Sequence, residues 1–513
     1  MRDNPGLVKR TQEKPVEWLW MDFNCLIYHC LRRPDLRPYP GLEGKEEWEA
    51  DFLKAIIAYT QKVVAEVKPT KGVYIGIDGV VPMAKMKQQR MRRFKSSWLT
   101  ENGLAEGQKE GPKERWDTNA ITPGTLFMGK LRKALEEVAR RKKWTVSSSD
   151  EPGEGEHKVM AQIRGLASSA TGAVYGLDAD LIVLSLLTQD TMAKGGKTVD
   201  LWLFREQVEE GSLVRNSMGE EVFQWFSIGG LRDILSKRVA IREYCFAMSF
   251  LGNDFLPASL GLKMRDDGHD VLMDLLSGKK LLQDDGSVGQ NVRQNTHFGG
   301  VSLLQNDEID PKGLELLLKA LAKEEERRIG IFVSKKLSQG SRFVGLELGH
   351  EDWPMSEKEE LCLMAGPRLR GDWQLVYRKV FLQEADVKDT VRVYYEGLRW
   401  IWDYYRGKEI CYNWYYPWSL PPLWSEIANG TGVNSVPVVV RGADIQPVEQ
   451  LCLVLPPASW DLIPSLKHRG LLTKAPYLFP KGFRFLSVGR RFFWECEAEV
   501  PIPSIREVKK ILT

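Results

Sequence analysis

The sequence predicts an α/β protein whose mixed, largely parallel central sheet is flanked by helices and carries a C-terminal lobe of helical and mixed structure packed on it. Short apolar runs alternate with amphipathic stretches from Trp18 to about Leu276, which is the pattern of strand–helix units in a parallel sheet. The C-terminal lobe is predicted from its aromatic content, because 12 of the 31 residues from Tyr394 to Trp424 are aromatic, against 10% in the whole chain.

The individual elements follow from the spacing of apolar residues. Strands are predicted at VEWLWMDF (16–23), at GVYIGID (72–78) and at GAVYGLDADLIVLSL, which runs from about residue 173. Helices are predicted at 52–67 and at about 241–250, where apolar residues recur at helical spacing.

Three regions are expected along the chain. Residues 1–276 would form the core that carries the active site. Residues 277–350 begin with a stretch rich in Gly, Asn and Gln and continue into a helix with the charge run KEEERR, which predicts a linker with a spacer helix whose charges face solvent. Residues 351–513 would form the aromatic-rich lobe that closes over the active site.

Composition excludes several classes of protein. In 513 residues, 43% are hydrophobic and 27% are charged, which is typical of a folded soluble protein rather than a disordered or fibrous one. The net charge of +3 is too small for the whole surface to act as a polycation, so a nucleic-acid site would need local segregation of charge.

Seven cysteines without a C-x-x-C pair argue against a disulfide framework or a zinc knuckle. No apolar run reaches the length that spans a bilayer, and the polar N-terminus lacks a signal core. We therefore expect an intracellular, cytoplasmic protein without a membrane segment, with the nucleus as the alternative because RRKK (140–143) is too short to decide.

Several carboxylates stand at the ends of apolar elements, where an acidic side chain is costly unless it is paired or bound to a metal. The carboxyl ends of parallel strands meet at one edge of a sheet, so some of these acids would converge there. Repulsion within such a cluster calls for divalent cations, and oxygen ligands favour two Mg²⁺ ions, for which Mn²⁺ can substitute. The candidates are Asp22, Asp78, Glu154, Glu156, Asp178, Asp180 and Asp254.

A basic segment follows Asp78 directly. Between Gly79 and Thr100 there are six cationic residues and no acid. If the chain is helical from Ala84 onward, four side chains lie roughly on one face and suit a terminal phosphate. These four are Lys85, Gln89, Arg92 and Arg93.

With these residues in hand, the chain resembles the 5′→3′ exoribonuclease family, the Xrn/Rat group. The resemblance rests on IDGVVPMAKMKQQRMRRF, NAITPGTLFM, PGEGEHK, GLDADLIVL, FLGNDFLP, YYEGLRWIWDYYRG, NWYYPW and LCLVLPPAS. These runs cover nearly the whole chain in the family order. The chain looks like a compact member that lacks the zinc knuckle and the long C-terminal extension of larger ones.

The resemblance implies a fold, a reaction and a set of roles. The core would be PIN/flap-nuclease-like, the seven acids would bind the two metal ions, and the four basic-face residues would bind a 5′-monophosphate. The protein would then be a processive enzyme of RNA decay, acting on single-stranded RNA as a monomer and releasing nucleoside 5′-monophosphates.

The family also stacks the first bases against aromatic side chains. At the position of the family's stacking His this chain has Tyr28, with His29 next to it, and Trp400 is the best match for the family's Trp, with Trp402 and Trp414 close in sequence. Two other functions stay open. A flap-type, structure-specific DNA nuclease shares the acidic core, and a catalytically inactive RNA-binding scaffold could retain the fold.

Overall fold

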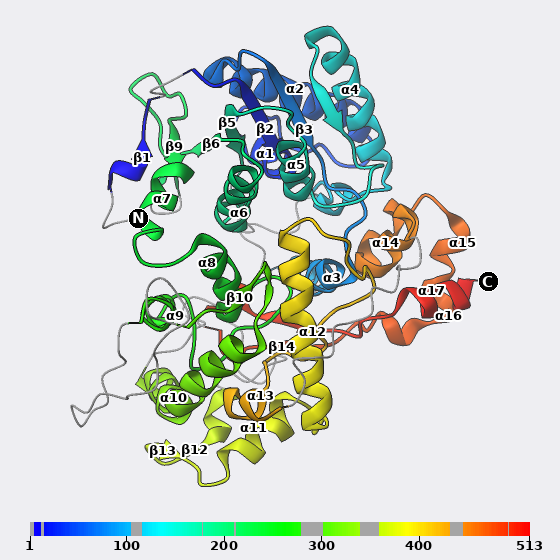
Figure 1. Cartoon of the computed structure of the whole chain (residues 1–513). Coiled ribbons are helices and arrows are strands. Elements are labelled where there is room, and N and C mark those ends of the chain that lie inside the picture. The colour runs from blue at the N-terminus through cyan, green and yellow to red at the C-terminus, as the bar shows by residue number, and fades with distance from the viewer. Residues whose placement is uncertain are drawn as a thin grey trace.

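The computed structural model describes residues 5–11, 15–103, 115–176, 178–209, 212–278, 301–338, 359–430, 445–490 and 492–512. A sheet with its covering helices is built from the first half of the chain, and a mostly helical part is built from the second half (Figure 1). None of the described helices combines the length and the apolar composition that crossing a bilayer requires.

A seven-stranded sheet forms the centre of the first half, in the order β1-β9-β6-β5-β2-β3-β4. Strands β6, β5, β2, β3 and β4 run parallel to one another, whereas β9 is antiparallel to β6 and to β1. The predicted mixed, largely parallel sheet is confirmed. The strands are β1 (Val8–Lys9), β2 (Trp18–Asp22), β3 (Gly72–Gly76), β4 (Thr145–Ser147), β5 (Ala170–Tyr175), β6 (Val199–Glu206) and β9 (Phe223–Ser227).

Helices cover both faces of this sheet because its central strand is apolar on both sides. Leu19 and Met21 of β2 are buried in one core, and Trp20 between them is buried in the other, as the two-residue period of a strand requires. The first core is closed by α1 (Asn24–Leu31), α2 (Lys45–Val67) and α4 (Leu126–Lys142). The second is closed by α5 (Gly155–Arg164), α6 (Asp180–Lys194), α7 (Ile228–Leu235), α8 (Ile241–Ala247) and α9 (Gly268–Leu276).

The strand predicted from about residue 173 is only partly a strand. Strand β5 ends at Tyr175, and the DLIVLSL run belongs to helix α6, which begins at Asp180. Leu181, Leu184 and Leu187 of this helix are all buried. A continuous apolar run looks the same in a buried strand and in a buried helix, so its periodicity could not separate the two.

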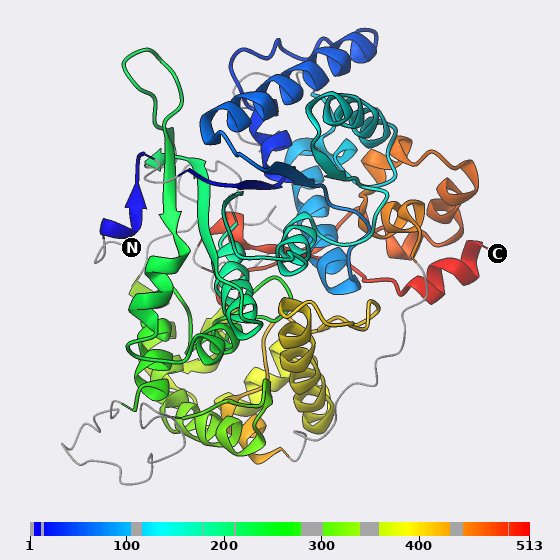
Figure 2. The same cartoon turned by 45° about the horizontal axis from the view of Figure 1, so that its top comes forward.

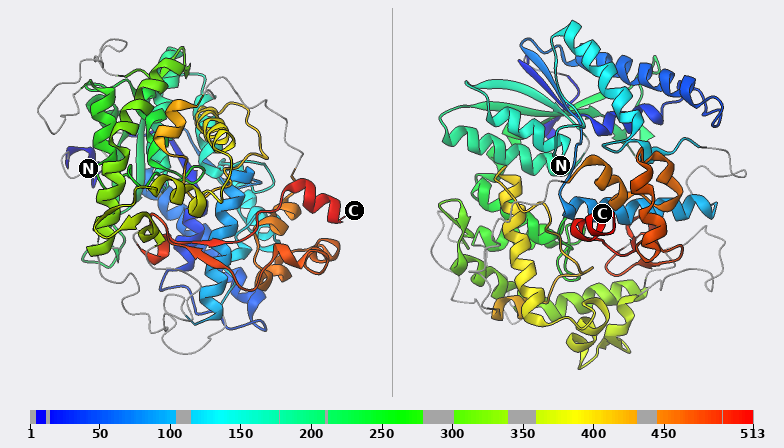
Figure 3. Two further views of the ribbon diagram at one scale, coloured as in Figure 1. Left: turned by 90° about the horizontal axis from the view of Figure 1, so that it is seen from below. Right: turned by 90° about the vertical axis from the view of Figure 1, so that its right-hand side faces the viewer.

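Helix α3 (Met83–Glu101) joins the sheet to the C-terminal elements, and Figure 3 shows those elements lying around it. Met86, Met91 and Phe94 of α3 share one apolar core with them. The elements are α14 (Pro447–Val454), α15 (Leu466–Arg469), α16 (Leu471–Lys474), α17 (Ile505–Leu512) and the hairpin of β14 (Arg484–Leu486) with β15 (Glu497–Glu499).

Half of the cations of α3 serve this junction rather than a ligand. The guanidinium of Arg90 is buried and donates to the backbone oxygens of Leu453 and Pro501 at 2.8 Å each. Lys95 and Lys87 likewise donate to backbone oxygens of C-terminal segments, at 2.6 to 2.8 Å. Three of the six cations in the basic segment therefore stabilise the contact between α3 and the C-terminal segments.

The predicted spacer helix is an integral part of the helical half. Helix α10 (Pro311–Ser338) buries Leu317, Leu321 and Val333, and Glu325 in its charge run is only 4% exposed. The Glu325 carboxylate accepts hydrogen bonds from the backbone N–H groups of Trp424 and Ser425 at 2.6 and 3.2 Å. The prediction that the whole run faces solvent is wrong, because this carboxylate caps the start of α13 (Trp424–Asn429).

The remaining elements complete this half and the rim of the sheet. Helices α11 (Trp373–Phe381) and α12 (Val387–Tyr405) pack in the helical half. Figure 2 shows the hairpin between β6 and β9 reaching out from the sheet, and this hairpin includes the short pair β7 (Val208–Glu209) and β8 (Ser212–Leu213). Two further small hairpins are formed by β10 (Leu304–Gln305) with β11 (Glu308–Ile309) and by β12 (Met364–Ala365) with β13 (Arg368–Leu369).

Candidate active site

Carboxylates gather at the carboxyl edge of the adjacent strands β5, β2 and β3. Asp22 is the last residue of β2, Asp78 comes two residues after β3, and Asp178 follows β5. These strands are parallel and neighbours in the sheet, so their ends bring the three side chains together. Asp180 is the first residue of α6, which places two acids in one strand–helix connection.

Helix α5 brings the next acids to the same edge. Glu154 precedes its first residue and Glu156 lies in its first turn. Between them, Gly155 packs so closely that an added Cβ would lie 2.7 Å from Asp22 Oδ1, so only glycine allows this approach. All seven predicted acids, including Asp254 after the short helix at Met248–Leu251, line one cavity of about 920 Å³.

The acids lie close enough to share cations. One ligand oxygen from each of Asp22, Glu156 and Asp178 lies within 4.8 Å of the others, and Glu154, Glu156 and His157 form a second such group. Asp78 is oriented by hydrogen bonds, since Oδ1 accepts from the Gly155 N–H at 2.7 Å and Oδ2 accepts from Asn24 Nδ2 at 2.9 Å.

The protein leaves this negative charge only partly compensated. Burial, together with repulsion from Asp78 and Asp178, raises the pKa of Asp22 well above its usual value. Burial and repulsion from Glu154 do the same to the pKa of Glu156, whose Oε2 is buried without a hydrogen-bond partner among the described residues. The group of Asp22, Glu156 and Asp178 offers oxygen ligands alone, one of them a buried oxygen without a donor, and this fits hard divalent cations.

Lys85 lies within the acid cluster. Its ammonium group contacts Glu154 Oε2 and Asp254 Oδ2 at 2.7 Å each. Burial alone would raise the pKa of Glu154, but Lys85, the neighbouring His157 and the Tyr404 hydroxyl outweigh it and hold the pKa below its usual value. The sequence assigned Lys85 to a phosphate pocket, whereas here it compensates two carboxylates.

The other residues of the predicted phosphate site line the same cavity. Arg93 is 8% exposed and its guanidinium donates to the Thr122 hydroxyl, yet it forms no ion pair with any described carboxylate. Gln89 is 6% exposed and its Oε1 has no hydrogen-bond partner within the described ranges. Arg92 is exposed. A buried cation without a carboxylate partner among the described residues is a site that favours an anion.

The three predicted stacking residues separate in the structure. Tyr28 and His29 of α1 are half-buried and line the cavity. Trp400 is 3% exposed and packs its ring against Trp414 at 5.2 Å, and it is not among the cavity's lining residues. The stacking role predicted for Trp400 does not agree with this position, because its ring faces the interior of the helical half.

Several residues near the acids were missed by sequence reasoning. The Tyr404 hydroxyl donates to Glu154 Oε1 at 2.6 Å, and the Tyr405 hydroxyl donates to Asp180 Oδ2 at 3.4 Å. The His157 ring stacks on Tyr404 with centroids 3.7 Å apart, and burial lowers the pKa of His157 to about 4. In the sequence, these residues are marked only by their position within the PGEGEHK and YYRG runs that resemble the family.

Comparison with known proteins shows which family the chain belongs to. The family model described as XRN 5'-3' exonuclease N-terminus matches residues 3–194, and the one described as Xrn1 helical domain matches residues 378–510. Together the two matches cover more than half of the chain. The chain belongs to the Xrn 5′-3′ exonuclease family. The first Xrn model covers six of the seven candidate acids and the basic helix, and the second covers α12 with Tyr404 and Tyr405.

Curated Xrn relatives match over different lengths. A 5'-3' exoribonuclease 2 of Candida glabrata is 35% identical over 317 residues, covering 50% of this chain and 30% of the relative. A 5'-3' exoribonuclease 1 of Schizosaccharomyces pombe is 26% identical over an alignment that covers 98% of this chain and 47% of the relative. A 5'-3' exoribonuclease 1 of Saccharomyces cerevisiae is 26% identical, with 89% and 38% covered. The chain spans less than half the length of each of these three relatives.

Proposed function

We propose that this protein is a 5′→3′ exoribonuclease that hydrolyses single-stranded RNA with a 5′-monophosphate, releases nucleoside 5′-monophosphates and acts in RNA decay. The observation that carries the proposal is the composition of one cavity. It holds seven carboxylates together with the buried guanidinium of Arg93, which has no carboxylate partner among the described residues. Two opposite charge sites in one cavity suit a substrate with two phosphates, one bound and one cleaved.

The acid cluster is proposed to bind two Mg²⁺ ions, which Mn²⁺ can replace. Its side chains supply only oxygen ligands, and the raised pKa values of Asp22 and Glu156 mark charge that cations would relieve. Bound ions would polarise the scissile phosphate and stabilise the attacking and leaving oxygens of an in-line displacement. The protein's part is orientation, since Asn24 and the Gly155 N–H hold Asp78, and Tyr404 and Lys85 hold Glu154.

The basic residues are proposed to select the 5′ end. Arg93 is fixed by its bond to Thr122, Gln89 offers an amide, and Arg92 is exposed and forms no hydrogen bond or ion pair with a described carboxylate. Together they would bind a terminal monophosphate through charge-assisted hydrogen bonds. Each cleavage leaves a new 5′-monophosphate on the shortened RNA, which the same residues can bind, so the enzyme would act processively.

The proposal is tested by giving the purified protein one RNA sequence with a 5′-monophosphate, a 5′-triphosphate or a 5′-hydroxyl end. We expect rapid release of nucleoside 5′-monophosphates from the first RNA only, with Mg²⁺ and not with EDTA. Equal degradation of all three ends would contradict the proposal, and so would binding of the monophosphate RNA without any product, which would point to an RNA-binding scaffold.

A flap DNA substrate is the matched comparison, because a structure-specific nuclease shares the acidic core. We expect cleavage of the flap to be slower than that of 5′-monophosphate RNA. A cytoplasmic, monomeric enzyme is part of the same proposal, and size-exclusion chromatography with light scattering and cell fractionation test it.

A further inference from the structure

The candidate active-site cavity has a second group of cations away from the basic helix. Helix α1 lines the cavity with one face, from Asn24, Cys25, Tyr28 and His29 to the two residues that follow its end, Arg32 and Arg33. Asn24 bonds to Asp78 of the acid cluster, and eight helical residues rise by about 12 Å. The cavity therefore extends along α1 from the acids to a basic rim.

The opposite side of this rim is the hairpin between β6 and β9. Val208, Ser212, Leu213 and Arg215 of the hairpin line the cavity. The hairpin's acidic residues Glu209 and Glu220 are described but are not among the lining residues. The rim thus offers three arginines, Arg32, Arg33 and Arg215, to whatever occupies the cavity.

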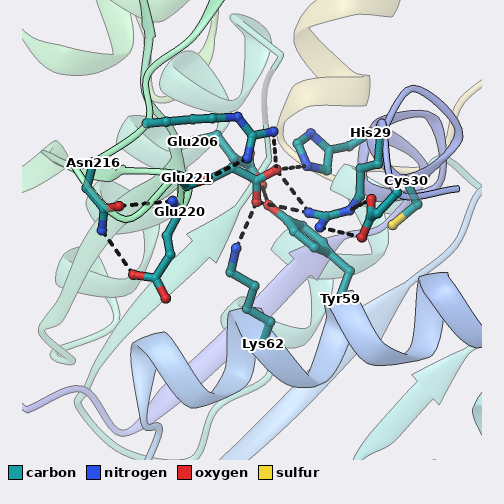
Figure 4. Close-up of polar contacts among 12 residues, drawn as sticks. His29, Cys30, Tyr59, Lys62, Glu206, Asn216, Glu220 and Glu221 are labelled. Carbon is teal, nitrogen blue, oxygen red and sulfur yellow. Dashed lines mark hydrogen bonds and ion pairs between the residues drawn. The ribbon is translucent and has the colours of Figure 1, made fainter.

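One buried carboxylate holds the two sides of the rim together (Figure 4). The Glu221 side chain is 1% exposed and accepts two hydrogen bonds from Arg33 Nη1 at 2.9 and 3.1 Å and one from Lys62 Nζ at 2.9 Å. His29 Nε2 lies 3.2 Å and Arg215 Nη2 lies 3.8 Å from Oε1. Glu221 follows Arg215 on the hairpin, so it ties the hairpin to α1 and α2.

The charges of the rim do not cancel. Besides Glu221, the rim cations have one further carboxylate partner among the described residues, Asp35, which bonds to Arg33 at 2.9 Å. Arg32 is exposed, and its guanidinium forms no hydrogen bond or ion pair with the residues that the structure describes. Four cations, counting Lys62, therefore face two carboxylates, and the Arg33 guanidinium is further fixed over the Tyr59 ring at 4.9 Å. A pre-ordered cationic surface of this kind attracts a polyanion.

We propose that Arg32, Arg33 and Arg215 form a second anion subsite that binds the phosphodiester backbone of single-stranded RNA on the 3′ side of the cleaved bond, with Arg33 and Arg215 held in place by Glu221. This inference rests on the proposed function. A substrate whose 5′-phosphate reaches Arg93 and whose first linkage reaches the acids must leave the cavity as a chain of phosphates. Where the cavity continues along α1, three arginines line its rim. Arg33 is paired with Asp35 and Glu221, whereas Arg32 has no carboxylate partner among the described residues. The subsite acts on RNA long enough to reach it.

The test compares a 5′-phosphorylated decanucleotide with a 5′-phosphorylated dinucleotide, using kcat/KM for each RNA. Arg215→Ala and Arg32→Ala are expected to lower the ratio of decanucleotide to dinucleotide kcat/KM about 10-fold each. The decanucleotide's KM should also become less dependent on salt, by about 0.7 in the log–log slope for each lost phosphate contact.

Lys62→Met is the matched control. Lys62 contacts the same Glu221 carboxylate and has the same 39% side-chain exposure as Arg215, but it does not line the cavity. It should leave the ratio at the wild-type value, which separates loss of an RNA contact from loss of a Glu221 partner. The Arg32 guanidinium has no hydrogen-bond or ion-pair partner in the described part of the chain, so Arg32→Ala keeps the test valid if Arg215→Ala unfolds.

The outcomes separate the two proposals. Suppose that the wild-type enzyme is active and that both arginine variants keep its ratio of decanucleotide to dinucleotide kcat/KM. This result would overturn the rim subsite but not the proposed function, and it would favour an acidic protein as the partner of the rim. A ratio lowered equally by Lys62→Met would also overturn the rim subsite. A wild-type protein that cleaves neither RNA would overturn the proposed function and this inference together.

Discussion

Tyr404 provides a sharp test of how the helical half supports the acid cluster. Its hydroxyl donates to Glu154 Oε1 at 2.6 Å, in a site where Tyr404 is 6% and Glu154 is 3% exposed. Tyr404→Phe removes only this donor. A buried hydrogen bond to a charged group contributes about 1.5–3 kcal/mol, and loss of an outer partner of a metal ligand typically costs about 10- to 100-fold in metal affinity or activity.

We therefore expect Tyr404→Phe to lower kcat/KM on 5′-monophosphate RNA about 10- to 100-fold and to raise the half-saturating Mg²⁺ concentration by a similar factor. Steady-state kinetics at a series of Mg²⁺ concentrations measure both, and calorimetric titration of Mg²⁺ reports binding without turnover. Tyr405→Phe should have a smaller effect, because its bond to Asp180 is 3.4 Å long.

The control for this substitution lies on the same helix. Tyr394 is also fully buried, but its hydroxyl has no hydrogen-bond partner among the described residues. Tyr394→Phe should keep wild-type Mg²⁺ dependence and should not lower the thermal unfolding midpoint. If Tyr404→Phe has the same Mg²⁺ dependence as Tyr394→Phe, the reasoning that Tyr404 orients Glu154 is refuted.

Three further predictions concern other parts of the molecule. Asp178→Ala or Asp180→Ala should reduce turnover to about 1% or less by removing charge from the metal site, and retention of more than a few per cent in a rapid-quench assay would contradict the assignment. Arg90→Met should lower the free energy of unfolding by about 3 kcal/mol, because backbone acceptors of C-terminal segments lose their donor; urea titration measures this, and an unchanged midpoint would exclude the structural role. The cations around Glu221 outweigh its burial and hold its pKa well below the usual range, so its stabilising effect is complete above about pH 4.5 and is lost as the pH falls further. Urea titrations from pH 7 to pH 3 should show a shallower acid loss in Glu221→Gln than in wild type, and parallel curves would exclude this role.

The sequence could predict the acid cluster because its geometry is local. Asp22 and Asp78 stand at the ends of apolar strands, and parallel strands end at one edge, so their convergence follows from topology. Glu154 stands between two glycines in PGEGEHK, a pattern typical of a turn. These predictions needed only the order of elements along the chain.

The features that the sequence could not predict depend on distant partners. Glu325 appeared as part of a solvated charge run, but its carboxylate accepts hydrogen bonds from backbone N–H groups 99 and 100 positions later in the chain. Arg90 was one of six cations in the basic segment without a predicted role, and it bonds to backbone oxygens more than 360 positions away. Trp400 was one of many aromatic residues, and only tertiary packing decides which of them is buried.

The measurement that tests the central claim most directly is the ratio of kcat/KM for 5′-monophosphate RNA to that for 5′-hydroxyl RNA, in wild type and in Arg93→Gln. If one cavity joins a phosphate-binding arginine to the acid cluster, the wild-type ratio should be large, and Arg93→Gln should lower it about 10- to 100-fold. Turnover of the 5′-hydroxyl RNA should change little. A ratio that is the same in both proteins would contradict the claim.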